Sequence, residues 1–119
     1  MSRSNLRIAI IVLTLATALI HLYLNIRIGH FDPPFTANAV GYLALLGVFL
    51  AQPPFLAGRE RLFHYAYMGF AAVTILAWFF IAWLPGGRSD VLAYITKAIE
   101  VLLIIALWQH LQLIGKSNF

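Results

Sequence analysis

The chain has 119 residues, of which 62% are apolar and only 10% are charged. A soluble domain has about one charged residue in four, so this composition excludes a water-soluble globular protein and predicts a single domain, residues 1–119, in a lipid bilayer. The net charge of +4 comes from scattered basic residues without a basic run, which excludes a nucleic-acid-binding surface, and the lack of cysteine excludes thiol chemistry and disulfides.

The first apolar segment covers residues 6–28. At about 1.5 Å per residue it is long enough to cross a hydrocarbon core of about 30 Å. Arg3 and Arg7 precede it, as basic residues precede a signal peptide, but its apolar run is longer than a typical signal-peptide core. We therefore expect an uncleaved first membrane span.

Three further apolar segments follow, separated by proline and glycine clusters. The second, residues 35–51, is near the lower length limit for a membrane span, whereas the third, 62–84, and the fourth, 91–114, are longer. Ser89 or Asp90 can cap the fourth segment. Because only internally hydrogen-bonded segments cross lipid, all of these segments are predicted to be transmembrane helices.

Short connections make consecutive helices antiparallel neighbours, so the predicted fold is an all-α, up-down four-helix transmembrane bundle. Arginine and lysine set its orientation, because cytoplasmic loops carry an excess of both. One side of the bundle holds Arg3, Arg7, Arg59, Arg61 and Lys116, and the other side holds Arg27 and Arg88. This bias predicts a multi-pass protein of the bacterial inner membrane with its N- and C-termini in the cytoplasm.

Two stripes of small residues are predicted to be the helix-packing faces. One is formed by Ala37, Gly41, Ala44 and Val48 on the second segment, and the other by Ala66, Gly69 and Ala72 on the third. Small side chains let helix backbones approach closely in lipid, where no hydrophobic effect drives helices together.

Polar residues from distant parts of the chain are predicted to meet in the outer half of the bundle. Counted at about 1.5 Å per residue, the depths of five residues agree within a layer about 10 Å thick. These residues are His21, Asn25, Tyr42, Lys97 and Glu100. On the first segment, Thr14, Thr17, His21 and Asn25 recur at helical spacing and form one polar stripe. On the fourth segment, Lys97 shares a helix face with Glu100. Because polar side chains avoid lipid, we expect this cluster to lie inside the bundle.

Two interpretations of this buried polar cluster stay open. In the first, its hydrogen bonds only fix which helix faces pair, as interhelical polar bonds in membranes commonly do. In the second, Glu100 is a proton- or cation-linked site, with His21 as its titratable partner and Lys97 tuning its charge. A carboxylate in the apolar part of a membrane segment is a functional candidate by default, because its burial costs free energy unless it is paired or protonated.

Two histidines at matched depth on the cytoplasmic side form a second candidate site. His64 lies near the start of the third segment and His110 near the end of the fourth. On antiparallel neighbours they could hold a b-type haem through both axial positions, with Gly69 leaving room for the macrocycle. The simpler interpretation is that both histidines lie at the membrane–water boundary without a ligand. The sequence predicts no metal site, and no cofactor other than this haem.

The stretches at residues 21–24, 38–43 and 95–103 read HLYL, NAVGYL and ITKAIEVLL. In these stretches the chain resembles small four-helix integral membrane proteins of Chloroflexus-like bacteria. The resemblance extends over most of the chain and implies the four-helix fold. It implies no activity and carries no functional residue across to this sequence.

These features predict a small polytopic membrane protein without catalytic activity, which acts as an accessory or structural subunit of a membrane complex. Its predicted partners are the lipid bilayer, other membrane subunits or further copies of itself. The alternative hypothesis is a proton- or cation-coupled small transporter or channel that works as an oligomer through Glu100. A third hypothesis is a haem- or quinone-associated electron-transfer subunit that uses His64 and His110.

Overall fold

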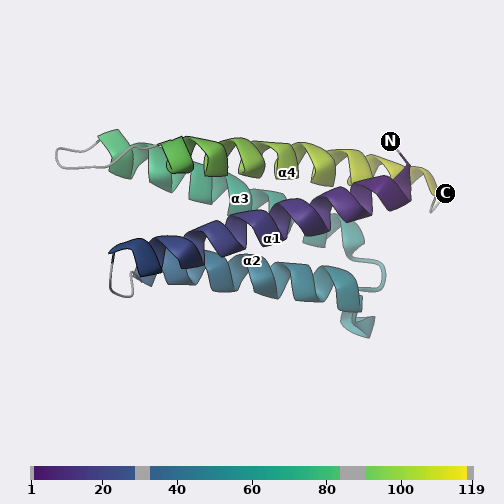
Figure 1. Ribbon diagram of the computed structural model, residues 1–119. Coiled ribbons are helices and arrows are strands. Elements are labelled where there is room, and N and C mark those ends of the chain that lie inside the picture. The colour runs from purple at the N-terminus through teal and green to yellow at the C-terminus, as the bar shows by residue number, and fades with distance from the viewer. Residues whose placement is uncertain (1, 29–32, 84–90, 118–119) are drawn as a thin grey trace.

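Within residues 2–28, 33–83 and 91–117, which the computed structural model describes, the protein is all-helical, as predicted (Figure 1). The helices are α1 (Arg3–Ile28), α2 (Pro33–Ala51), the short 3-10 helix η1 (Pro54–Leu56), α3 (Glu60–Trp83) and α4 (Val91–Ser117). Each of the four α-helices contains nearly all of one predicted segment. The all-α, four-helix architecture is therefore confirmed.

The helix boundaries follow from a few residues. α2 begins two residues before the predicted segment, because Pro33 and Pro34 fit a first helical turn, where no backbone N–H is needed. α3 begins at Glu60, since a carboxylate is favourable at a helix N-terminus. Between them, Gln52 and Gly58 have φ angles of 47° and 78°, which turn the chain out of the right-handed helical conformation.

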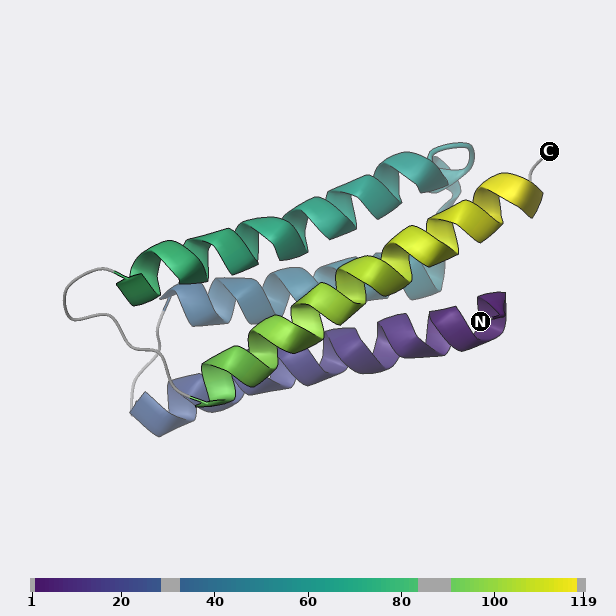
Figure 2. The ribbon, with the colours of Figure 1, turned by 90° about the horizontal axis from the view of Figure 1, so that it is seen from above.

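The helices run alternately up and down, and the start of α1 and the end of α4 lie at the same end of the bundle (Figures 1 and 2). The backbone of α1 packs against α2 and α4, and that of α3 against α4. Side chains connect α2 to α3. Thr74 donates a hydrogen bond to Asn38 at 2.8 Å, and the Phe70 ring lies edge-on to Tyr42 with 4.8 Å between ring centroids.

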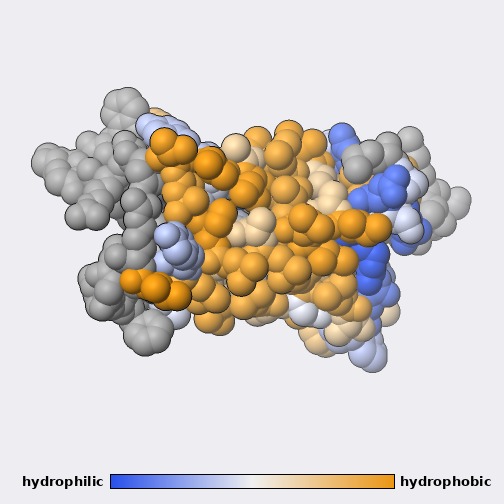
Figure 3. Space-filling model, viewed as in Figure 1, coloured by the Kyte–Doolittle hydropathy of each residue, from blue (hydrophilic) through white to orange (hydrophobic). Residues whose placement is uncertain are grey.

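Three of the described helices are long and apolar enough to cross a membrane, over Arg3–Tyr23, Glu60–Phe80 and Val91–Leu113. The apolar stretch of α2, Thr36–Ala51, is shorter. In the space-filling view, hydrophobic residues cover the middle of the visible face, and hydrophilic residues gather at the end where α1 begins (Figure 3). This distribution is typical of a helical bundle whose middle faces lipid.

The predicted packing stripes of small residues lie mostly on the outside of the bundle. Ala37 and Ala44 on α2 are exposed, as are Ala66 and Gly69 on α3, so the prediction that these stripes are internal packing faces was wrong. Tyrosine, threonine and histidine side chains need partners that lipid cannot supply. The polar faces of α2 and α3 therefore turn inward and the small-residue faces turn outward.

Three residues of these stripes, Gly41, Val48 and Ala72, are half-buried, and Gly41 has a close neighbour on another helix. A Cβ atom built at Gly41 would overlap the ring of Phe70 on α3. The close neighbour is thus an aromatic ring and not the helix backbone that the small-residue stripe predicted. This contact lies one residue from Tyr42 and brings the middle of α2 against α3.

Candidate functional site

The first candidate site is centred on Glu100 of α4, whose side chain has no exposed surface. Its Oε2 atom accepts a short hydrogen bond from the hydroxyl of Tyr42 on α2. Its Oε1 atom lies 2.5 Å from Nζ of Lys97, three residues earlier on the same helix. Glu100 therefore links two helices through one oxygen and has a balancing charge at the other.

Lys97 is the least enclosed member of this group, with 11% of its side chain exposed. Its Nζ atom lies 5.9 Å from the ring centroid of Trp78 on α3, a distance at which a cation is attracted to an aromatic face. Among the described residues, the Lys97 ion pair is the one polar contact of Glu100 Oε1, which makes no hydrogen bond. The positive charge is thus held between a carboxylate and an indole ring.

His21 of α1 lies beside this ion pair. Its Nδ1 atom is 2.7 Å from the backbone oxygen of Thr17, so Nδ1 carries a proton and donates it to that carbonyl. The His21 and Tyr42 ring centroids are 6.2 Å apart. We refer to Glu100, Lys97, Tyr42 and His21 as the Glu100 cluster.

The structure therefore brings together four of the five residues that depth counting assigned to one layer. The fifth, Asn25, has a side chain outside the described part of the structure. Thr14 and Thr17, which extend the predicted stripe on α1, are both fully buried. Thr14 Oγ1 lies 2.5 Å from the hydroxyl of Tyr67 on α3, so this stripe also connects α1 to α3.

Three residues of α3, Tyr67, Thr74 and Trp78, hold these helices together, a role that the sequence did not predict for them. A signal for them was present, because all three share one helix face with His64, at spacings of three, seven and four residues. Tyr67 and Thr74 are buried, and their hydrogen bonds reach α1 and α2. Applying the same periodicity to α3 as to α1 would have identified this face.

The second candidate site is the histidine pair, His64 of α3 and His110 of α4. His64 Nε2 lies 2.9 Å from His110 Nδ1, and the two rings lie edge to edge in nearly parallel planes, with 5.1 Å between centroids and 8° between planes. His64 Nδ1 lies 2.8 Å from the backbone oxygen of Glu60 and therefore donates its proton there. His64 Nε2 is then the acceptor, so His110 Nδ1 must be the donor between the two rings.

This geometry does not fit the predicted haem. Histidine nitrogens bind metals at about 2.0–2.1 Å, so two axial nitrogens on one iron are about 4 Å apart on opposite sides of it. The two nitrogens of the histidine pair are in direct hydrogen-bond contact at 2.9 Å, which leaves no space for an iron between them. We therefore derive no haem chemistry from His64 and His110, and the room beside Gly69 plays no part.

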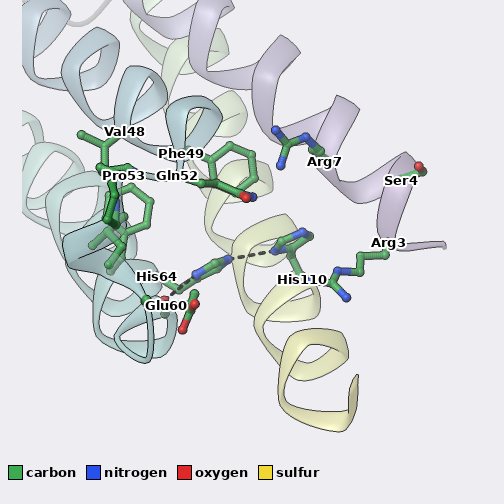
Figure 4. Close-up of a pocket in the computed structure, with 14 residues that line it drawn as sticks. Arg3, Ser4, Arg7, Val48, Phe49, Gln52, Pro53, Glu60, His64 and His110 are labelled. Carbon is green, nitrogen blue, oxygen red and sulfur yellow. Dashed lines mark hydrogen bonds between the residues drawn. The ribbon is translucent and has the colours of Figure 1, made fainter. Parts of the chain in front are cut away.

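The histidine pair borders a cavity of about 450 Å³ at the end of the bundle where α1 begins (Figure 4). We refer to it as the Arg–His cavity, after the residues that give it its character: Arg3, Arg7, His64 and His110. Phe49 of α2 forms part of the wall. The Arg7 guanidinium carbon lies 5.1 Å from the Phe49 ring centroid, and the His110 ring stands edge-on to Phe49 at 5.5 Å.

Within the described part of the chain, no three histidine, aspartate or glutamate side chains come together in a way that could hold a metal ion. The two candidate sites are therefore an ion pair with hydrogen-bond partners and a histidine pair beside a basic cavity.

Comparison of the chain with protein-family models, with curated proteins and with solved structures finds no match. The resemblance to four-helix proteins of Chloroflexus-like bacteria stays a prediction. The function proposed below is supported by the residues and geometry of this chain alone.

Proposed function

We propose that this protein is an accessory subunit of the bacterial inner membrane, which crosses the bilayer several times and packs against helices of a larger membrane complex. The observation that carries this proposal is a row of small residues on the outer face of α2. The row consists of Ala37, Val40, Ala44, Gly47 and Ala51, all exposed. We refer to it as the α2 stripe.

The α2 stripe has the spacing and the side chains of a helix-packing surface. Its residues follow one another at three and four positions, so they lie on one side of the helix. Apart from its chain neighbours and its own helix backbone, no described residue has an atom within 4 Å of a Cβ built at Gly47, so no other helix of the described chain covers it. Small residues at such a surface let a second helix approach closely and gain van der Waals contacts that lipid tails do not supply as well.

The Glu100 cluster supports a structural role over a catalytic one. A reacting group must meet its substrate, whereas Glu100 has no exposed surface and is held by Tyr42 and Lys97. The Arg–His cavity does not extend to Glu100. A buried network of this kind fixes the rotation of α2 and α4 relative to each other, which a docking surface on α2 requires.

The proposal is tested by lengthening one side chain of the α2 stripe. Ala44→Leu adds volume at the proposed contact, and Ala98→Leu adds the same volume at an exposed position of α4. After mild solubilisation of native membranes, tagged wild-type protein and Ala98→Leu should co-purify with the same membrane proteins, identified by mass spectrometry, whereas Ala44→Leu should lose them. Equal recovery of partners by the two variants would contradict the role of the α2 stripe.

The proposed orientation places Arg3, Arg7, Arg59 and Arg61 on the cytoplasmic side, because basic residues are retained there. A reporter fused after Phe119 should be active in the cytoplasm. A reporter inserted between residues 86 and 87 should be active outside the cell. If a cytoplasmic reporter and an external reporter give equal signals at either site, the protein inserts in both directions, which would contradict this orientation.

One observation favours a second candidate, a proton- or cation-coupled carrier that works as an oligomer. The Glu100 cluster gathers a carboxylate, an ammonium, a phenol and an imidazole in one buried layer, which is typical of ion and proton pathways in membrane proteins. Glu100→Gln keeps the shape and removes the titration. If this folded variant loses a proton- or cation-dependent flux that wild-type protein shows in liposomes, the carrier replaces the accessory subunit as the best proposal.

A further inference from the structure

The positive charge of the Arg–His cavity comes from two arginines in the first turns of α1. Arg3 and Arg7 are four residues apart and therefore share a face of the helix, and both line the cavity (Figure 4). Among the described residues of the lining, the one carboxylate is Glu60 of α3, which accepts a hydrogen bond from the backbone N–H of Gly58 at 3.4 Å. The lining thus carries more positive than negative charge before either histidine is protonated.

Guanidinium groups suit phosphate because their planar array of N–H donors matches two phosphate oxygens at once. Arg7 is half-buried and its guanidinium rests on the Phe49 ring, which limits the positions that the side chain can take. A donor that is held in place loses less conformational entropy when it binds a ligand. Arg7 is therefore the first residue that we expect an anion to meet.

The histidine pair adds a donor only when it takes up a proton. The Nδ1 protons of His64 and His110 are both used, one on the Glu60 carbonyl and one between the rings. In the neutral pair, His110 Nε2 is consequently an acceptor, and within the described residues no hydrogen bond to it is present. An acceptor repels a fully ionised oxygen, so a proton at His110 Nε2, which turns that nitrogen into a charged donor, favours a bound anion.

The remaining walls are apolar. Phe49 and Phe63 line the cavity together with Val48 and Leu56, so a group larger and less polar than the anion itself can be accommodated. A volume of about 450 Å³ is in the range of small-molecule sites, about 300–1,000 Å³. Within the described part of the lining, the charged groups beside His110 are Arg3 and Arg7 on α1 and Glu60 on α3, with His64 as its neutral neighbour.

We propose that the Arg–His cavity binds a phosphate group, either free or as the headgroup of an anionic lipid, through Arg7 and a His110 that takes up a proton from solution when the anion enters. The free and the lipid-bound source share the same recognition chemistry. A lipid source adds contact of its glycerol and acyl carbons with the phenylalanine walls.

The test measures binding to the full-length protein in detergent by calorimetry, with two probes at pH 7: inorganic phosphate and dihexanoyl phosphatidylglycerol. Saturable binding of both with similar affinity indicates the free anion, and tighter binding of the phosphatidylglycerol indicates the lipid headgroup; either supports the proposal. Arg7→Gln should weaken binding about tenfold, since it removes a charge-assisted hydrogen bond. Arg61→Gln, the same charge change at an exposed position outside the cavity, should leave the affinity unchanged.

The proton is tested with phosphatidylglycerol, whose charge is constant between pH 6 and pH 8. Wild-type protein should bind it more tightly as the pH falls, and folded His110→Gln should lose this pH dependence. Arg7→Lys keeps the charge but not the fork of donors and should fall between Arg7→Gln and wild type, which tests the site even if His110→Gln does not fold. The proposal is overturned if neither probe saturates, if Arg7→Gln and Arg61→Gln bind equally, or if His110→Gln keeps the wild-type pH dependence.

Discussion

Glu100 and His110 are both buried polar residues of α4, ten residues and about 15 Å apart along the helix, yet the sites around them are built in opposite ways. Glu100 is fully enclosed and has its counter-charge inside the cluster, at Lys97. His110 borders a cavity whose other charged groups are mostly positive. A polar group whose partners are complete serves to join helices, whereas one beside a cavity lined by guanidinium groups is suited to bind a ligand.

The largest effect is expected where the enclosed cluster loses its negative charge. Glu100→Leu leaves the Lys97 ammonium and the Tyr42 hydroxyl without their partner, and removing one member of a buried ion pair costs about 3–5 kcal/mol. Glu100→Gln should cost less, because the amide can still accept the Tyr42 hydrogen bond. Reversible unfolding in detergent and lipid mixtures measures both changes in the free energy of unfolding.

The double variant Lys97→Met/Glu100→Leu is the control for this interpretation. It removes both charges together, so it should be more stable than Glu100→Leu alone. If the double variant is the less stable of the two, the loss in Glu100→Leu reflects packing and not an unpaired charge.

A smaller difference is expected between two tyrosines. Tyr42→Phe removes a hydrogen bond to a carboxylate, which is worth about 1.5–3 kcal/mol when one partner is charged. Tyr67→Phe removes a hydrogen bond between two neutral hydroxyls, with Thr14, worth about 0.5–1.5 kcal/mol. The same unfolding measurement compares them, and an equal loss in both variants would indicate that Glu100 is protonated and the cluster uncharged.

A further difference of similar size contrasts packing beside the two sites. Gly41→Leu, next to Tyr42, should destabilise the bundle by about 1–3 kcal/mol, because the new side chain overlaps the Phe70 ring. Val48→Leu, one methylene larger at the wall of the Arg–His cavity, should change the stability by less, since the cavity offers room. Equal thermal unfolding of the two variants would mean that α2 and α3 separate easily at Gly41.

The sequence was sufficient for the helices and for the depth of the polar residues. Long apolar segments with proline and glycine between them predict four helices, and counting residues along them places Glu100, Tyr42 and His21 at one level. Depth counting does not give the rotation of a helix about its axis. The small-residue stripes were consequently assigned to the wrong side of α2 and α3.

The histidine pair and its cavity show a second limit of the sequence. Counting residues placed His64 and His110 at the same depth. Whether their nitrogens are 2.9 Å apart, as in the hydrogen-bonded pair, or about 4 Å apart, as two ligands of one iron would be, depends on how the surrounding side chains pack. The cavity is lined by residues from all four helices and the α2–α3 connection. A sequence pattern within one segment therefore cannot predict this cavity.

The contrast between an enclosed and an open site is tested most directly by the reactivity of single cysteines, because the natural chain contains none. Thr96→Cys places a thiol at a position that is 1% exposed, one turn from Glu100, and Val48→Cys places one in the wall of the Arg–His cavity. In protein reconstituted into nanodiscs, a water-soluble maleimide should label Val48→Cys and leave Thr96→Cys unlabelled, while both should react after denaturation in detergent. Labelling of Thr96→Cys at the rate of Val48→Cys, or an inert Val48→Cys, would contradict this account.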